Sequence, residues 1–87
     1  MHIERLTAEI EATFKETPLE QIPARIKWLE SYVADREKYL SVYKARLESG
    51  KKMQRHQMVA IRQFPKCIAE TSLVIRALKE GYEHRIG

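Results

Sequence analysis

The sequence predicts an all-α protein: an antiparallel, coiled-coil-like hairpin of two long helices, with a short N-terminal helix packed alongside to complete a three-helix bundle. Apolar residues recur at alternate steps of three and four over two long stretches, a pattern typical of heptad-based helices. The 87 residues include only three glycines and three prolines. With 44% hydrophobic and 32% charged residues, the chain is too apolar for a disordered segment and suits a single small helical domain over residues 1–87.

The first helix is expected over about residues 2–16. Its apolar face consists of residues at helical spacing, which are Ile3, Leu6, Ile10 and Phe14. Two prolines, Pro18 and Pro23, follow closely. Pro18 fits the start of a helix, but Pro23 removes an amide donor and crowds the turn before it. We therefore expect a short turn at 18–22 and a second helix that begins near Pro23.

The second helix is expected over about residues 23–48. Its apolar seam alternates steps of four and three: Ile22, Ile26, Leu29, Val33, Arg36, Leu40, Tyr43 and Leu47. Only Arg36 is charged among them. Gly50 follows Ser49 directly, and glycine readily adopts the left-handed conformation that ends a helix. The chain is therefore expected to turn back at these two residues.

The third helix is expected over about residues 51–83. It has a matching seam of Ile61, Phe64, Ile68, Thr71, Ile75, Leu78 and Tyr82. Pro65 lies inside this series without disturbing its phase. Because two separate helices would have little reason to share one register, we expect a single helix kinked near Pro65, and a break with a new start at Pro65 is the alternative. Two matched seams joined by a short turn predict an antiparallel hairpin.

Residues beside the second helix's seam form another apolar stripe, made of Trp28, Tyr32, Tyr39 and Val42, and Tyr43 of the seam adjoins its aromatic members. A helix that packs against only one other helix needs a single apolar seam, so this second stripe requires another surface to cover it. We interpret it either as core beneath the first helix or as a partner-binding surface, since Trp and Tyr anchor many interfaces. A second copy of the chain is a further candidate to cover it. Leu73 is expected to face outward, because consecutive residues of a helix cannot all enter one seam.

The net charge of +4 is concentrated near the expected hairpin tip. Residues 44–66 contain one acidic residue, Glu48, and seven basic ones, which we name the basic patch: Lys44, Arg46, Lys51, Lys52, Arg55, Arg62 and Lys66. Four of these would form one straight stripe on a continuous helix: Lys52, Arg55, Arg62 and Lys66. Such a stripe suits a phosphate backbone or an acidic protein surface. A charged, solvated helix face without a partner is the alternative interpretation.

Arg36 is the second feature of interest, because it occupies a seam position of the expected hairpin. A charge at such a position costs stability, although it can fix the register or pair with a buried acid. Its guanidinium can also reach the wet edge of a thin bundle. Thr71 and Gln57 on the opposing helix are its candidate polar neighbours.

No catalytic or metal-binding set is expected. His2, His56 and His84 are far apart, and Cys67 has no histidine near it in the sequence, so neither a metal site nor an activated thiol is indicated. One cysteine excludes an intramolecular disulfide and fits a reducing compartment. No stretch has the length and apolarity of a signal peptide or a membrane span. We expect no cofactor, no membrane association and a cytoplasmic protein, or a nucleoplasmic one if the source is eukaryotic.

The expected function is that of a small non-enzymatic accessory or adaptor protein, a regulator or an inhibitor, which binds a larger protein or complex through the surface of its helical hairpin. The alternative is a nucleic-acid-binding protein that uses the basic hairpin tip. Against this alternative, no tyrosine or tryptophan is interleaved with the basic patch to stack on bases. A homodimer is the third partner arrangement that the stripe of aromatic residues suggests.

Overall fold

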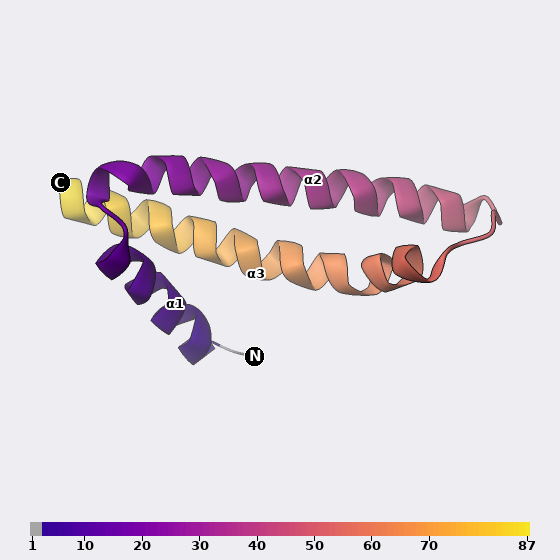
Figure 1. The fold of residues 1–87 in the computed structure, drawn as a ribbon, viewed down its shortest axis with the longest axis horizontal. Coiled ribbons are helices and arrows are strands. Elements are labelled where there is room, and N and C mark those ends of the chain that lie inside the picture. The colour runs from indigo at the N-terminus through magenta and orange to yellow at the C-terminus, as the bar shows by residue number, and fades with distance from the viewer. Residues whose placement is uncertain (1–2) are drawn as a thin grey trace.

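The computed structural model describes residues 3–87, which form three α-helices and one turn of 3₁₀ helix (Figure 1). Helix α1 spans Ile3–Glu16, the 3₁₀ turn η1 spans Leu19–Gln21, α2 spans Ile22–Glu48 and α3 spans Arg55–Ile86. Helices α2 and α3 pack antiparallel along their length, and α1 lies alongside them at the end that holds the C-terminus. The predicted all-α hairpin with a short N-terminal helix is therefore confirmed.

The turn of the hairpin begins at the expected glycine. Gly50 has a φ of 75°, which lies in the left-handed region that glycine adopts without a steric penalty. Its N–H donates to the carbonyl of Leu47 at 3.1 Å, and the N–H of Lys51 donates to the carbonyl of Arg46 at 3.3 Å. This pair of hydrogen bonds is the Schellman motif, which satisfies carbonyl groups at the end of a helix.

Helix α3 begins at Arg55, later than the expected start at residue 51. The first N–H groups of a helix need acceptors, and the lysines that follow Gly50 offer none. Gln54 supplies the start instead: it is extended, with φ −82° and ψ 157°, and its N–H donates to the side-chain oxygen of Gln57 at 3.0 Å. Residues 51–54 consequently form a loop, which Arg46 holds by donating from Nε to the carbonyl of Lys52 at 3.1 Å.

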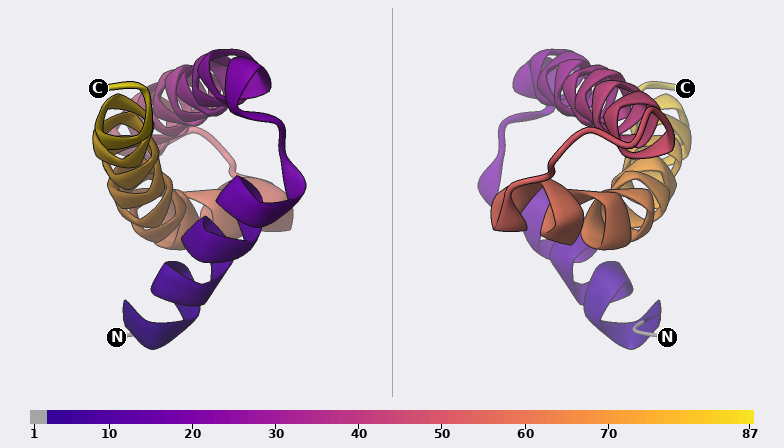
Figure 2. Two further views of the ribbon diagram at one scale, coloured as in Figure 1. Left: turned by 90° about the vertical axis from the view of Figure 1, so that its left-hand side faces the viewer. Right: turned by 90° about the vertical axis from the view of Figure 1, so that its right-hand side faces the viewer.

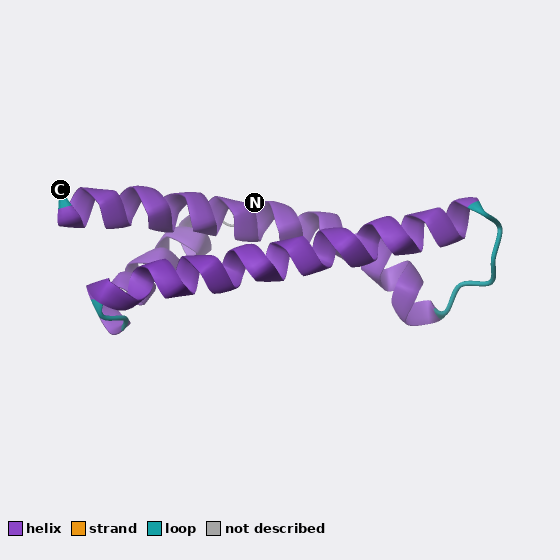
Figure 3. Ribbon diagram, turned by 90° about the horizontal axis from the view of Figure 1, so that it is seen from above, coloured by secondary structure: helices purple, strands orange, loops and turns teal. Residues whose placement is uncertain are grey.

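Helix α3 continues through Pro65, so the alternative of a break with a new helix start is wrong. Pro65 has no N–H to donate to the preceding turn, and its ring crowds the carbonyl of that turn. The turns of α3 nearest the loop bend away from the line of the rest of the helix (Figures 2 and 3). We attribute this bend to Pro65, because proline is the usual cause of a sharp change in helix direction.

The buried core lies at the end of the hairpin remote from the loop, which we call the anchored end. The core consists of apolar residues from both long helices: Ile22, Ile26, Leu29, Val33, Ile75 and Leu78. Toward the loop the same seam becomes exposed, because Arg36, Leu40 and Tyr43 are only half-buried and Leu47 is 44% exposed. The radius of gyration of 16.1 Å exceeds the roughly 12 Å of a compact domain of this length. The hairpin is thus anchored at one end and thinly packed at the other.

Helix α1 packs on α3 at the anchored end. Leu6 is buried, and Ile10 and Phe14 pack against the core. The ring of Phe14 approaches Gly81 so closely that a Cβ on Gly81 would lie 2.7 Å from it. Figure 2 shows that the N-terminal end of α1 is directed away from α2. Helix α1 therefore leaves the loop half of the hairpin uncovered.

We expect Leu78→Ala to lower the free energy of unfolding by roughly 2–5 kcal/mol, since it opens a cavity in the core. Leu47→Ala is the matched control, because it removes the same atoms from the same seam at the loop end. Its cost is expected to be below about 1 kcal/mol, since Leu47 is already 44% exposed and truncation removes little buried area. Urea denaturation followed by circular dichroism measures both values. Equal losses for the two variants would show that the core does not lie at one end.

Candidate interaction surfaces

Aromatic and arginine side chains form a continuous series of contacts along α2 and onto α3. We call this series the aromatic ladder: Arg25, Trp28, Tyr32, Arg36, Tyr39, Tyr43, His56 and Phe64. At the anchored end, the guanidinium of Arg25 lies 5.1 Å from the centroid of the Trp28 ring. Trp28 in turn stacks on Tyr32, with ring centroids 6.1 Å apart and an angle of 16° between the ring planes. Contacts of both kinds are attractive, because the negative face of an aromatic ring favours cations and offset rings.

Arg36 occupies the middle of the aromatic ladder, between rings from two helices. Its guanidinium carbon lies 4.6 Å from the centroid of Tyr32 and 5.1 Å from that of Phe64. Hydrogen bonding with Tyr32 is the main cause of a pKa of Arg36 that is raised above its already high ordinary value, so the side chain stays cationic. Thr71 and Gln57 are the polar neighbours expected for Arg36, but the groups that its guanidinium contacts are the rings of Tyr32 and Phe64. Gln57 instead accepts a hydrogen bond at the start of α3.

Tyr43 connects the two long helices near the loop. Its ring centroid lies 6.1 Å from Tyr39 on α2, 6.5 Å from Phe64 on α3 and 6.4 Å from His56, whose ring it meets edge-on. These are aromatic contacts at the rim of the seam, where Tyr43 and Phe64 are half-buried and His56 is exposed. The loop half of the hairpin is therefore held mainly by rings and one cation, with Ala60 as its one buried aliphatic residue among those described.

The outer edge of the aromatic ladder is open to solvent. Trp28 is 58% exposed and Tyr39 is 47% exposed, whereas Tyr32 packs partly against the core. The interpretation of Trp28 and Tyr39 as core beneath the first helix is therefore wrong. Helix α1 packs on α3 instead, where Gly81 admits the ring of Phe14. Their role as a partner-binding surface stays a prediction.

The seven residues of the basic patch are all exposed. They surround the tip of the hairpin: Lys44 and Arg46 in the last turns of α2, Lys51 and Lys52 in the loop, and Arg55, Arg62 and Lys66 on α3. The predicted stripe of four loses Lys52, because α3 begins only after the loop. Three basic residues, Arg55, Arg62 and Lys66, remain on the helix itself.

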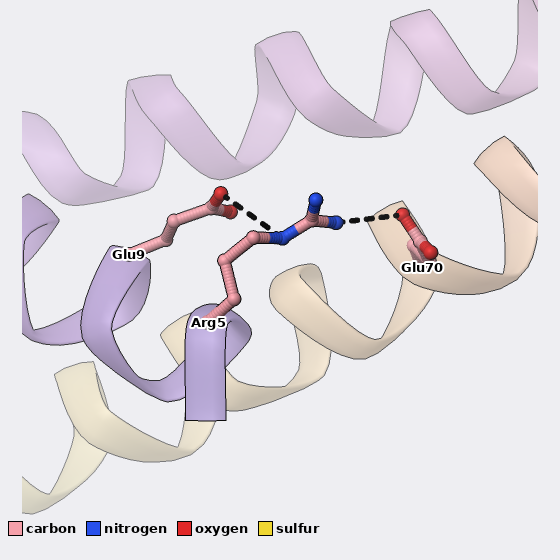
Figure 4. A network of polar contacts seen from close by, with 3 residues as sticks. All are labelled: Arg5, Glu9 and Glu70. Carbon is pink, nitrogen blue, oxygen red and sulfur yellow. Dashed lines mark ion pairs between the residues drawn. The ribbon is translucent and has the colours of Figure 1, made fainter. Parts of the chain in front are cut away.

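The ion pairs of the described residues lie toward the anchored end, away from the loop. Arg5 contacts Glu9 at 3.8 Å and Glu70 at 3.5 Å (Figure 4). The other two pairs are Arg76–Glu80 at 3.2 Å and Lys79–Glu30 at 3.0 Å. Over the part of the chain that the structure describes, no ion pair involves a basic-patch residue. The positive charge of the tip is consequently left for solvent ions or a partner.

Apolar side chains accompany the basic patch at the loop half of the hairpin. Val42 and Leu47 of α2 and Met58 and Val59 of α3 are all exposed, although residues of this size are usually buried. Leu73, farther along α3, is exposed as expected. The tip therefore combines cations with apolar contact area, and this combination suits binding to the surface of another protein.

Among the described residues, the remaining candidate groups lie in separate parts of α3: His56 at its start, Cys67 in its middle and His84 near its end. His2 lies outside the described residues, His84 is exposed and distant from His56 in the sequence, and Cys67 is a half-buried free thiol. Among the described residues, no group of three His, Cys, Asp or Glu side chains is placed to hold a metal ion.

A groove of about 400 Å³ lies between α1 and the hairpin. Its polar lining consists of Arg5, Glu9, Thr13, Glu16, Arg25, Glu70 and Thr71.

No protein-family model, curated protein or solved structure matches this chain. None of the described helices combines the length and the apolarity needed to cross a membrane. Two surfaces of the hairpin are therefore the candidates for a function: the basic patch at its tip and the aromatic ladder along α2.

Arg36→Gln is expected to lower the free energy of unfolding by roughly 1–2 kcal/mol, because it removes two cation–ring contacts. Arg62→Gln is the matched control, since Arg62 is an exposed arginine on the outer face of α3 and its loss should change stability by less than about 0.5 kcal/mol. Thermal and urea denaturation measure both variants. A cost for Arg36→Gln no greater than for Arg62→Gln would show that the ladder contributes nothing to the loop half.

Proposed function

We propose that this chain is a small non-enzymatic accessory or adaptor protein that binds an acidic surface of a larger protein through its hairpin tip. The observation that supports this most is the basic patch, whose seven exposed cations have Glu48 as the single acid within residues 44–66. Exposed aliphatic side chains lie at the same end. A partner with acidic residues around an apolar centre would satisfy both features.

The cations and the apolar side chains of the tip would contribute to binding in different ways. Clustered charges of one sign raise the local concentration of an oppositely charged partner and increase the rate of association. The apolar side chains then provide area that leaves water on binding, which charged groups alone do not supply. A single cluster that combines cations with aliphatic side chains suits a protein partner better than a polyanion without apolar groups.

The distribution of stability along the hairpin suits this role. The core and α1 lie at the anchored end, so the tip contributes little to the fold and is free to present side chains to a partner. The loop is nevertheless ordered by defined contacts, since Arg46 holds the carbonyl of Lys52 and Gln57 holds the N–H of Gln54. A partner would therefore meet a preformed surface, which limits the entropy lost on binding.

Charge reversal at the tip tests the proposal. Arg55→Glu combined with Arg62→Glu is expected to abolish capture of the partner from extract of the source cells treated with nuclease, because it replaces two attractions with two repulsions. Lys15→Glu combined with Lys27→Glu is the matched control, since it changes the net charge equally at exposed positions near the anchored end. Capture is measured by quantitative mass spectrometry of what co-purifies with the tagged chain. Equal recovery with both double variants would contradict the proposal.

Binding to nucleic acid is the second candidate, and one observation favours it. The fold brings the rings of Tyr43, His56 and Phe64 together near the basic loop, so three aromatic residues that lie near basic-patch cations in the sequence form one cluster. If nucleic acid is the partner, affinity for a single-stranded oligonucleotide should fall steeply with salt, with a slope of roughly 0.7 per phosphate contact on logarithmic axes. Fluorescence anisotropy measures this slope. Absence of binding at low salt excludes this candidate.

A further inference from the structure

Helix α2 carries a second heptad series beside the seam that packs on α3. Its members again alternate steps of four and three: Trp28, Tyr32, Asp35, Tyr39, Val42 and Arg46. On a helix this spacing aligns the six side chains in one stripe, as the contact positions of a coiled coil are aligned. The series runs over most of α2, which no glycine or internal proline interrupts beyond Pro23 at its start. We call these six residues the outer seam.

The outer seam is largely uncovered in one copy of the chain. All of its members except Tyr32 are exposed, and Val42 is 54% exposed. The chain has an accessible surface of 6766 Å², whereas a compact monomer of 10.3 kDa would have roughly 5,400 Å². The excess is larger than the roughly 800 Å² that each partner contributes to an interface of standard size. The elongated hairpin therefore has enough spare surface for a stable contact between copies.

We propose that a second copy of this chain covers the outer seam, so that two α2 helices pair as an antiparallel coiled coil. Charge determines the direction. In a parallel pair in register, Asp35 would face the Asp35 of the second copy and Arg46 would face its own equivalent, and like charges at such positions are destabilising. An antiparallel pair places different outer-seam residues opposite one another and removes both conflicts from the seam, while Lys38, which flanks the seam and is exposed, lies beside its own equivalent at the solvent-accessible edge.

One antiparallel register matches every member of the outer seam with a suitable residue of the second copy. Trp28 lies opposite Arg46, Tyr32 opposite Val42 and Asp35 opposite Tyr39. These pairs are a cation over an aromatic ring, an apolar contact, and a phenol hydroxyl that donates to a carboxylate. A two-fold axis makes each pair occur twice. The aromatic residues that α1 leaves uncovered thereby gain partners.

This pairing has a consequence that rests on the proposed function. In an antiparallel dimer, the two hairpin tips point in opposite directions, so each end of the dimer presents the basic-patch residues other than Arg46. Such an assembly would bind two acidic partners, or two sites on one large partner, at the same time. Bivalent binding of this kind raises the overall affinity without any new contact at either site.

Solution mass tests the dimer directly. Light scattering coupled to size exclusion should give twice the monomer mass of 10.3 kDa for the wild-type chain, and Tyr39→Glu with Val42→Glu should give a monomer with unchanged helical circular dichroism. Leu73→Glu is the control, because Leu73 is an exposed apolar residue of α3 outside the outer seam, and it should stay dimeric. A monomeric wild type, a dimer that survives the double change, or dissociation by Leu73→Glu would each overturn the proposal.

A cysteine placed beside the two-fold axis tests the register. Residues 31, 38 and 45 each precede a member of the outer seam, and in an antiparallel coiled coil these flanking positions lie beside one another. In this register position 38 lies beside position 38 of the second copy. In a Cys67→Ala background, Lys38→Cys is therefore expected to form a disulfide-linked dimer under mild oxidation. Ser31→Cys is the matched control and should not cross-link to itself, since Ala45 of the second copy lies opposite it. Equal cross-linking at both positions, or none at position 38, would contradict this register. Because mass and cross-linking do not involve the acidic partner, their failure is distinguishable from failure of the proposed function.

Discussion

Burial of the α2–α3 seam at the anchored end is the interaction on which the rest of the structure depends. Ile22 and Leu78 are fully buried there, and each side chain of this size contributes roughly 1.5–3 kcal/mol when it leaves water. Lys79 donates to Glu30 at 3.0 Å beside this contact, but an exposed ion pair adds little to stability. The apolar contacts therefore set which residues of the two helices face each other, and the positions of the aromatic ladder and of the tip follow from that register.

The two ends of the hairpin consequently have different physical characters. At the anchored end, α1 adds a third layer, and three cations there pair with carboxylates: Arg5, Arg76 and Lys79. At the loop, the seam thins to half-buried rings, and the cations of the basic patch have no such partners among the described residues. A fold that is stabilised at one end leaves the other end available for binding, and the proposed adaptor role depends on this separation.

The helices could be predicted from the sequence because each carries apolar residues at helical spacing, with Arg36 as the one charged member of the two long seams. The position of α1 could not be predicted, because its apolar face could pack against either side of the hairpin. The contact that fixes it is between Phe14 and Gly81, two residues far apart in the sequence. Charge spacing alone places Lys52 on a helix, because it does not reveal that Gln54 and Gln57 delay the start of α3. The ring partners of Arg36 depend on the hairpin register, which heptad spacing leaves undetermined. The basic patch itself is evident from the sequence, since its seven residues fall within one stretch, 44–66, that contains a single acidic residue.

Native-state hydrogen exchange along α3 tests most directly the claim that stability is concentrated at one end. We expect the amides of residues 75–82, which lie on the core, to exchange only through global unfolding and to share one large free energy of opening. The amides of residues 58–64, near the loop, should exchange through smaller openings with markedly lower free energies. Similar protection of the two segments would contradict the division of the hairpin into a stabilising end and an end available for binding.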